Sequence, residues 1–415
     1  MTLRELSYDE YNKHLESFDH SIYQTTSYGK SLEKENYEVL YIGYFDIEKV
    51  LALSFIFIKN IDRYKYAYCP RGFIIDYTDY NLLTNFTNEI KKLLSKKGIC
   101  AIKLCPNIVK NKYDNDKNLI YTNSDYDYIL SNLSNLGYRH LGYNNKFEAM
   151  KPRYEAIIDL NKPYYEVFKN IQKRYRTKIR SAENMGIRIH KSNESKLDLL
   201  YNQSKKKYMR GLEYFNNLYT NFNLNSKAEF YYAKLDINYY LKVMQDKYIK
   251  QENIVNELND KILIGNNNEK NRLIERKITE EKLFNKYQND LKYAVDINKK
   301  NEDIILSTLL VVTHNKDAYV LMDTYDKTFS TMNAKHLLIW KILEKYSQEG
   351  YNTINLGGIV NCNDNQDKYY GLTKFKLNFG SIIYEYMGDL ELITNKPLYL
   401  MYKNSAPLRL LKNKN

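Results

Sequence analysis

The sequence predicts a mixed α/β (α+β) fold that contains one structural unit twice, with a helical hairpin inserted in the second copy. Two stretches of the chain have the same order of elements, they keep nearly the same internal spacing, and a charged segment with a heptad pattern lies between them. A duplicated unit is the simplest explanation of such a repeat.

Each stretch runs from a β-type segment to a helix with a glycine stop and then to a short strand. These features are 51–58, Gly98 and 102–104 in the first stretch, and 305–312, Gly350 and 353–356 in the second. The two β-type segments begin 254 positions apart, and the two glycines lie 252 positions apart. The matched spacing predicts that both stretches fold alike.

The first unit is expected to be a domain of residues 1–150. Its predicted elements are helices at 8–18, 26–35 and 81–98, and strands at 38–44 and 51–59. The segment FDIEK between the two strands reads as a hairpin turn. CPRGF at 69–73 reads as a rigid turn, because proline fixes φ and glycine accepts conformations closed to other residues.

The second unit is expected to occupy residues 151–239 and 304–395, with a tail at 396–415 that packs back on the first domain. It starts with a strand in KPRYEAIIDL (151–160), followed by a strongly basic helix from Tyr164 to Met185 and a helix from Leu197 to Arg210. The division into two domains agrees with the length of 415 residues.

Residues 240–303 are expected to form an antiparallel coiled-coil arm. A seam recurs at spacings of three and four residues, and all of its positions but Gln251 are apolar: Leu241, Met244, Tyr248, Gln251, Val255, Leu258 and Ile262. The polar GNNN at 265–268 is a turn, and a second helical pattern follows it. The alternative is a helix pair that mediates dimerisation.

Composition indicates a folded protein with a basic surface. The hydrophobic content is 43%, and 63 Lys and Arg against 50 Asp and Glu give a net charge of +13. This charge favours an anionic partner such as nucleic acid, a phosphorylated substrate or an acidic membrane, although a lysine-rich protein without such a partner has the same balance.

Cysteine and histidine usage argues against a metal site. The four cysteines form no CxxC pair and the six histidines have no metal-ligand spacing, so free thiols in a reducing cytosol are expected. The N-terminus is charged and no apolar run approaches the roughly 20 residues of a membrane span. We therefore expect a cytoplasmic protein.

The repeated order of helices, β-hairpin, helix and strand suits the acetyltransferase-like (GNAT) fold. Ordinary members bind the pyrophosphate of acetyl-CoA with a glycine-rich turn at a helix N-terminus. The equivalent helix start here, TMNAKHLLIWKIL (331–343), has no glycine. Acetyl-CoA is therefore not the expected acyl donor.

Nine segments together resemble the FemABX family of tRNA-dependent aminoacyltransferases, which add amino acids to the stem peptide of peptidoglycan precursors. The resemblance covers nearly the whole chain and depends on the order and spacing of the segments, since none is decisive alone. They are QTTSYGK (24–30), YCPRGFIIDY (68–77), KPRYEAIIDL (151–160), KRYRTKIRSAENMGI (173–187), YMRGLEYF (208–215), TYDKTFSTMNAKHLLIWKIL (324–343), LGGI (356–359), GLTKFKLNFG (371–380) and EYMGDLEL (385–392).

The resemblance implies that an amine of the stem peptide attacks the aminoacyl ester of tRNA. Such an ester is already activated, so the enzyme mainly orients the reactants and stabilises the oxyanion. In the family this role is associated with the lysine of a Phe-Lys pair, which corresponds to Phe375 and Lys376 here. The alternative for Lys376 is a solvated lysine on a strand or turn.

The resemblance also implies which residues bind the precursor. The matching positions are Lys30, Arg210 and Tyr214, and both cations suit a diphosphate. As alternatives, Lys30 and Arg210 are surface charges and Tyr214 is a core aromatic residue.

Two positions depart from the family pattern. Tyr28 stands where a tryptophan is common, and Cys105 stands where an aspartate before proline is often found. The second departure puts an acid-base role at this position in doubt. Asp76 and Asp79 lie nearby in the chain, but the sequence does not show that either replaces the missing carboxylate.

The tRNA is expected to contact the basic helix through Lys173, Arg174, Arg176, Lys178 and Arg180. The arm is a second candidate for this contact. A charge run of this kind is also typical of a solvated helix face.

Two hypotheses follow. The first is an enzyme that moves an amino acid of the Gly, Ala or Ser class from aminoacyl-tRNA to a peptidoglycan precursor, with lipid II as the expected acceptor and the soluble UDP-MurNAc-pentapeptide as the alternative. It uses aminoacyl-tRNA as co-substrate and no cofactor, binds no DNA, and contacts the inner membrane face peripherally. The alternative is a non-catalytic adaptor that binds tRNA or membrane-associated cell-wall enzymes. The sequence does not identify the amino acid, because small side chains differ by only about 1–3 kcal/mol in a binding pocket.

Overall fold

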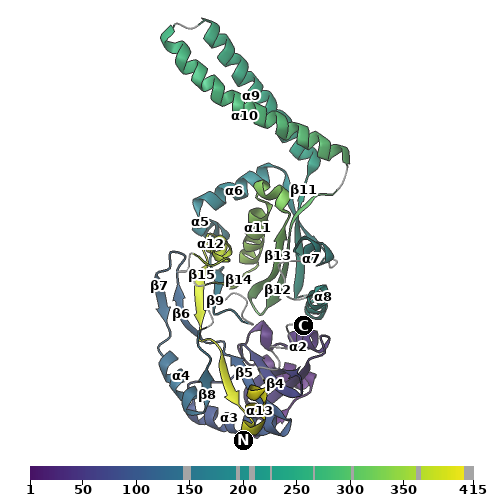
Figure 1. Cartoon of the computed structure of the whole chain (residues 1–415), viewed down its shortest axis with the longest axis vertical. Helices are drawn as coiled ribbons and strands as arrows, with labels where there is room; N and C mark the ends of the chain where they lie inside the picture. Colours follow the sequence, from purple (N-terminus) through teal and green to yellow (C-terminus); the bar gives the residue numbers. More distant parts are fainter. Residues whose placement is uncertain are drawn as a thin grey trace.

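The computed structural model describes residues 1–143, 151–192, 197–204, 211–224, 227–264, 267–300, 303–360 and 366–405. The chain forms an elongated body of two lobes, each built on one β-sheet, and a helical arm that projects from one end of the body (Figure 1). The mixed α/β fold expected from the sequence is confirmed.

The first lobe is built on a seven-stranded sheet with the order β1-β2-β3-β4-β5-β16-β8. Its strands are β1 (Thr2–Glu5), β2 (Glu38–Asp46), β3 (Lys49–Ile61), β4 (Tyr64–Pro70), β5 (Ile99–Cys105), β16 (Leu390–Ile393) and β8 (Tyr138–His140). Its helices are α1 (Tyr8–Leu15), the 3-10 helix η1 (Ile22–Gln24), α2 (Thr26–Glu33), α3 (Tyr80–Lys96), α4 (Tyr126–Asn135) and α13 (Lys396–Asn404).

The second lobe is built on a nine-stranded sheet with the order β10-β11-β12-β13-β14-β9-β15-β6-β7. Its strands are β10 (Ile187–Ser192), β11 (Ala228–Leu235), β12 (Ile305–His314), β13 (Asp317–Tyr325), β14 (Thr353–Ile359), β9 (Tyr154–Asp159), β15 (Ile382–Tyr386), β6 (Val109–Tyr113) and β7 (Leu119–Thr122). Its helices are α5 (Tyr164–Asn170), α6 (Lys173–Asn184), α7 (Leu197–Ser204), α8 (Leu212–Asn223), the 3-10 helix η2 (Lys327–Met332), α11 (Ala334–Gln348) and α12 (Tyr370–Leu377).

The repeat seen in the sequence is one supersecondary unit present in both lobes. In the first lobe β3 pairs antiparallel with β4, and β4 pairs parallel with β5 across helix α3. In the second lobe β12 pairs antiparallel with β13, and β13 pairs parallel with β14 across helix α11. Parallel neighbours need such a crossover connection. The expected repeat is therefore confirmed as a structural repeat.

Hydrophobic periodicity places the crossover helices on their sheets. Helix α3 buries Leu83, Phe86, Ile90 and Leu94 completely, at the spacing of one helix face. A further core joins the two lobes and contains Leu32 and Phe55 from the first lobe and Phe222, Phe230 and Leu310 from the second. The lobes thus share one buried apolar interface.

The two sheets exchange strands. Strands β6 and β7, from the first third of the chain, extend the second sheet by pairing with β15. In return β16, near the C-terminus, lies between β5 and β8 in the first sheet. β6 and β7 thus come from the expected first domain but belong to the second sheet, and β16 comes from the expected second domain but belongs to the first sheet. The four-part division of the chain stays a prediction.

Helices α9 (Ile237–Ile264) and α10 (Asn267–Lys300) form the projecting arm (Figure 1). Met244, Gln251 and Leu258 of the expected seam are buried. The polar seam position Gln251 donates from Nε2 to the Glu280 carboxylate at 2.7 Å, so its amide is satisfied inside the helix pair. Supercoiling of the two helices as a coiled coil stays a prediction.

The long basic helix expected from Tyr164 to Met185 was a wrong prediction. Ile171 and Gln172 have extended backbone conformations and divide it into α5 and α6. The break allows Ile171 to be buried and the Gln172 N–H to donate to the Asn378 carbonyl at 3.0 Å. A tertiary contact has overridden local helix propensity here.

At the C-terminal end, α13 packs on the first lobe, where Tyr399 joins Tyr66, Cys100 and Ala101 in a small core. Residues 406–415 of the expected tail lie outside the described residues. Across the described part of the chain, no helix combines the length and the apolar character needed to cross a bilayer.

The exchanged strand β16 should be necessary for the stability of the first lobe. Leu392 is 1% exposed, so Leu392→Ala should lower the free energy of unfolding by about 2–5 kcal/mol, as measured by urea denaturation. The matched control is Ile393→Ala on the same strand, where the side chain is 37% exposed and the loss should stay below about 1 kcal/mol. Equal losses in the two variants would contradict the packing assigned to β16.

Candidate active site

Lys376 lies on α12 with its amine directed at the backbone of β14. Its Nζ donates to the Gly358 carbonyl at 2.7 Å, and the residue is only 8% exposed. Two hydrogen bonds hold α12 in place: the Val360 N–H donates to Thr373 Oγ1 in the middle of the helix, and the Ser381 hydroxyl donates to the Lys376 carbonyl near its C-terminal end. Lys376 is therefore a buried, oriented group rather than the solvated lysine considered as the alternative.

Strand β14 is irregular at the point where it meets Lys376. Its pairing with β9 shifts register between Asn355 and Gly358, and Gly357 has a φ of +84°. A Cβ atom at Gly357 would stand 3.5 Å from the Lys376 amine. A side chain would thus be in ordinary van der Waals contact with the amine, and glycine is favoured here because it adopts the positive φ without strain.

Asn355 stabilises this irregular backbone and connects it to a buried carboxylate. Its Oδ1 accepts a hydrogen bond from the Gly357 N–H at 2.7 Å, and its Nδ2 donates to Glu155 Oε2 at 2.7 Å. Glu155 lies on β9, the neighbouring strand of β14. The backbone beside Lys376 is thus tied to a charged group in the sheet.

Glu155 pairs with Arg71, which comes from the CPRGF turn of the first lobe. The Arg71 NH2 atom lies 2.8 Å from Glu155 Oε1, and the two side chains are 2% and 7% exposed. Arg71 also donates to the Pro152 carbonyl at 3.1 Å and lies over the ring of Tyr386 at 3.5 Å. This buried ion pair connects the two lobes.

The electrostatics of the pair follow from its burial and its geometry. Burial alone would raise the pKa of Glu155, but the charge of Arg71 and the hydrogen bond from Asn355 lower it below its usual value. Burial would lower the pKa of Arg71, but the Glu155 carboxylate raises it above its usual value. Both groups are therefore ionised at neutral pH.

Cys105, where a family aspartate was expected, lies at the edge of this cluster. Its Sγ is 3.6 Å from Arg71 NH1, and burial raises the pKa of the thiol to about 11. The carboxylate beside Cys105 is that of Asp389, which forms an ion pair with Lys103 at 2.6 Å. The strand exchange has placed it there, because β16 follows Asp389 directly and pairs with β5.

The two acidic residues singled out near CPRGF have structural contacts instead. Asp76 accepts hydrogen bonds from the Thr78 N–H and hydroxyl. Asp79 is the N-cap of α3 and accepts from the Leu82 N–H at 2.9 Å. Both carboxylates therefore shape the loop before α3.

Phe375, the neighbour of Lys376, faces an aromatic cluster. Its ring lies within 5.2–5.8 Å of the rings of Tyr175, His336 and Phe379, and the amine of Lys335 lies 4.6 Å above it. These contacts pack α12 against α6 and α11. The catalytic role suggested for Phe375 stays a prediction.

Two of the three expected precursor-binding residues lie on neighbouring helices. Lys30 on α2 is half-buried, with its amine 3.6 Å above the ring of Tyr8. Tyr214 on α8 is half-buried against Phe215. Helices α2 and α8 touch through the Ser31 hydroxyl, which donates to the Asn217 carbonyl at 3.2 Å.

Arg210 lies outside the described residues, immediately before the N-cap of α8 at Gly211. Its role in precursor binding therefore stays a prediction, as do those of Lys30 and Tyr214.

Four residues of this site were not singled out for a role by the sequence: Arg71, Lys151, Glu155 and Asn355. Lys151 is 8% exposed, and its amine lies 2.7 Å from the centre of the Tyr23 ring. Arg71, Lys151 and Glu155 belong to motifs that carried the family resemblance, so those motifs were the available signal. Asn355 directly precedes the LGGI motif.

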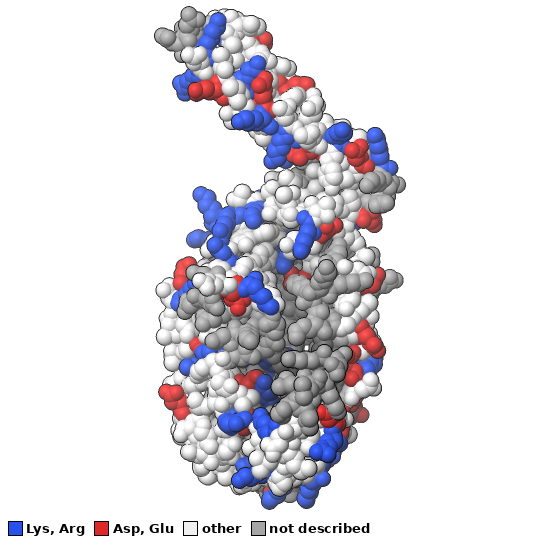
Figure 2. Space-filling view, in the orientation of Figure 1, with Lys and Arg blue, Asp and Glu red and all other residues white. Residues whose placement is uncertain are grey.

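The basic residues expected to contact tRNA lie together on α6 (Figure 2). Lys173, Arg174, Lys178 and Arg180 are exposed, whereas Arg176 is half-buried. Arg174 donates to Asn378 Oδ1 at 2.9 Å, close to the C-terminal end of α12. The basic face thus adjoins the helix that carries Lys376, and nucleic-acid contact there stays a prediction.

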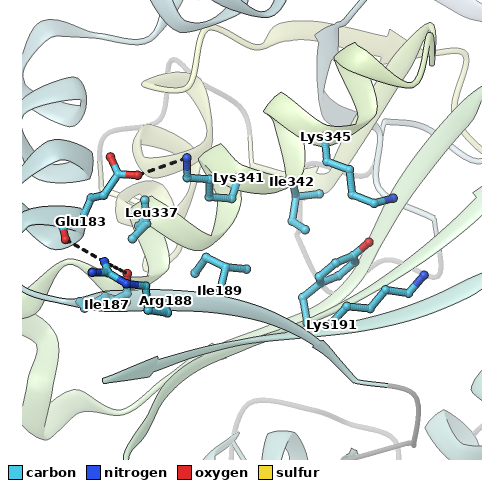
Figure 3. Close-up of a pocket in the computed structure, with 10 residues that line it drawn as sticks. Glu183, Ile187, Arg188, Ile189, Lys191, Leu337, Lys341, Ile342 and Lys345 are labelled. Atoms are coloured by element: carbon cyan, nitrogen blue, oxygen red, sulfur yellow. Dashed lines mark hydrogen bonds and ion pairs between the residues drawn. The ribbon is translucent and has the colours of Figure 1, made fainter. Parts of the chain in front are cut away.

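A pocket of about 380 Å³ lies elsewhere, between β10 and α11 (Figure 3). Its lysines face acidic side chains: Lys341 pairs with Glu183 at 3.3 Å, and Lys345 pairs with Glu229 at 3.2 Å. None of its lining residues was expected to be catalytic or to bind the precursor. Because Lys341 and Lys345 are already held in ion pairs, and none of the residues expected to be catalytic lines this pocket, we do not assign the active site to it.

Among the described residues, no three His, Cys, Asp or Glu side chains come together in a way that could hold a metal ion. The site contains an oriented lysine and a buried polar network.

The architecture defines the class of protein. Two lobes each contain the unit of antiparallel strands, crossover helix and parallel strand, so the chain has a tandem GNAT-like fold. A model of the FemAB family matches residues 3–405. The chain belongs to the FemAB family, as the resemblance of its motifs predicted.

The relatives and the solved structures agree with this membership. The lipid II:glycine glycyltransferase of Staphylococcus haemolyticus (strain JCSC1435) is 24% identical over 380 residues, which cover 88% of this chain and 86% of that protein. A protein of the same name from Staphylococcus aureus is 24% identical over 391 residues, with the same coverage. The crystal structure of FemX superposes with a TM-score of 0.74 at 20% identity, covering 97% of this chain and 99% of that one.

Removal of Arg71 should leave Glu155 buried without its counter-charge. Arg71→Met should therefore lower the free energy of unfolding by about 3–5 kcal/mol, as measured by urea denaturation at neutral pH. The control is Arg63→Met, which changes an exposed arginine and should cost less than about 1 kcal/mol. A loss for Arg71→Met no larger than that of the control would contradict a buried ion pair that joins the lobes.

Proposed function

We propose that this protein transfers glycine from glycyl-tRNA to an amine of the stem peptide of lipid II, in the synthesis of peptidoglycan bridges. Membership of the FemAB family and the glycyltransferase activity in the names of the relatives support the substrate and the amino acid. The observation that carries the proposal in this chain is the buried amine of Lys376, fixed on the Gly358 carbonyl at 2.7 Å.

The proposed reaction is an aminolysis of an ester. The nitrogen of the stem-peptide amine forms a bond to the glycyl carbonyl carbon, and a tetrahedral intermediate with an oxyanion results. The carbon–oxygen bond to the terminal ribose of tRNA then breaks. The amine loses one proton overall, and the released ribose hydroxyl gains one.

Lys376 would stabilise the oxyanion in this scheme. A cation that is already oriented before the reaction needs no reorganisation when charge develops, and removal of such a group typically costs about 10²–10³ in rate. The close approach of β14 at Gly357 and the hydrogen bond to Gly358 supply this orientation. No serine or cysteine nucleophile is required, because the ester is the activated species.

The acceptor and the donor would approach from different parts of the molecule. Lys30, Arg210 and Tyr214 are the proposed precursor-binding residues, with the two cations on the diphosphate. The basic face of α6 is the proposed contact for tRNA, since clustered Lys and Arg neutralise phosphates. Lipid II is held in the membrane, so we also propose peripheral contact with its inner face.

A screen with charged tRNAs tests the proposal. The purified protein is incubated with lipid II or, in a separate reaction, with UDP-MurNAc-pentapeptide. Each reaction contains tRNA charged with glycine, alanine or serine, and the masses of the products are measured by mass spectrometry. The expected product is lipid II with an added glycine. The same assay separates the proposal from the adaptor hypothesis, because an adaptor gives no product with any charged tRNA.

Lys376→Met should abolish transfer without unfolding the protein. We expect kcat to fall by at least about 10²-fold, because the oxyanion loses its charge partner. Lys374→Met is the matched control, since Lys374 is an exposed lysine on the same helix and its loss should leave kcat within about twofold. Circular dichroism checks the fold of both variants. Full activity of Lys376→Met would exclude the role assigned to this lysine.

A further inference from the structure

We infer that Asn355, Glu155 and Arg71 form a positioning relay that holds the amine of Lys376 in its reactive orientation. The inference rests on the proposed function, because it assigns a role to residues that act through Lys376. It differs from that proposal in locating part of the control of Lys376 in the other lobe.

The first step of the relay is the backbone of β14. The Gly358 carbonyl accepts the hydrogen bond of the Lys376 amine. The direction of this carbonyl depends on the irregular backbone from Asn355 to Gly358. Asn355 fixes that turn, because its Oδ1 accepts from the Gly357 N–H at 2.7 Å. A shift of this short segment would move the carbonyl and the amine together.

The second step fixes the amide of Asn355. An asparagine side chain rotates unless both of its ends are bonded. Its Nδ2 donates to Glu155 Oε2 at 2.7 Å, and the residue is 8% exposed. With Oδ1 on Gly357 and Nδ2 on Glu155, the amide has one orientation.

The third step fixes Glu155 from the other lobe. Its second oxygen, Oε1, pairs with Arg71 at 2.8 Å. Arg71 in turn is held by the Pro152 carbonyl and by the ring of Tyr386. Each group in the series therefore has a bonding partner on both sides, and the series ends in the CPRGF turn of the first lobe.

The relay should affect the rate of the chemical step more than substrate binding. A misplacement of about 1 Å at a reacting centre can cost on the order of 10²-fold in rate. None of the three relay residues is a proposed contact of lipid II or tRNA. Loss of the relay should therefore lower kcat and leave KM nearly unchanged.

Asn355→Ala tests the relay without removing a charge. We expect kcat for transfer to fall on the order of tenfold, with KM for lipid II changed by less than about twofold. The matched control is Asn111→Ala, because Asn111 Nδ2 likewise donates to a buried glutamate in the same sheet, Glu385, at 2.8 Å. The control should keep kcat within about twofold, since its bonds do not lead to Lys376.

A double-mutant cycle separates positioning from a general loss of structure. If Asn355 acts through Lys376, the change Asn355→Ala should cause little further loss of kcat in the Lys376→Met background. If it acts through stability alone, the two losses should multiply. Multiplied losses, or an unchanged kcat for Asn355→Ala alone, would overturn the inference.

A measurement without substrate keeps the inference testable when a variant is inactive. Lysine amines are labelled by reductive methylation, and the labelled peptides are quantified by mass spectrometry in the wild-type protein, Asn355→Ala and Asn111→Ala. The peptide with Lys376 should be labelled several-fold faster in Asn355→Ala only. Equal labelling in all three proteins would overturn the relay. Absence of transfer by the wild-type protein, with altered labelling in Asn355→Ala, would refute the proposed function and leave the relay intact.

Discussion

The ion pair between Arg71 and Glu155 constrains this structure more than any other polar contact at the candidate site. Two charges in the interior cost several kcal/mol each to desolvate, so each requires the other in good geometry. Arg71 belongs to the first lobe and Glu155 to the central region of the second sheet. The pair is therefore formed only when the lobes are docked in one register, and the apolar core between them supplies the driving force for that docking.

The exchange of strands also fixes the position of the two lobes relative to each other. β16 completes the first sheet, whereas β6 and β7 extend the second, so neither sheet is made from one continuous segment of the chain. The exchange also brings the carboxylate of Asp389 to Cys105, ahead of β16, and it joins the two halves of the chain through Asn111 on β6, whose Nδ2 donates to Glu385 on β15. The two repeats therefore form one body, and residues of both lobes build the candidate site.

The chemistry proposed for this protein explains why its site is a fixed polar network rather than the pocket between β10 and α11. Aminolysis of an activated ester requires a cation held in one orientation beside the oxyanion more than an enclosed cavity with a nucleophile. Burial of Lys376, its hydrogen bond to the Gly358 carbonyl and the bonds of Asn355 all restrict the position of one amine. In the pocket, by contrast, Lys341 and Lys345 are each held in an ion pair with a carboxylate.

The sequence by itself determined the elements: the repeated unit, the helix faces such as that of α3, the helical arm and the family motifs with Lys376, because periodicity and stop signals are local. Tertiary structure alone decided the break between α5 and α6, the exchanged strands, the carboxylate beside Cys105 and the path from Arg71 to Lys376. Each of these depends on contacts between residues far apart in the chain, such as Gln172 with Asn378 and Arg71 with Glu155. Local propensity carries no information about such contacts, whose free energy exists only after the lobes have packed.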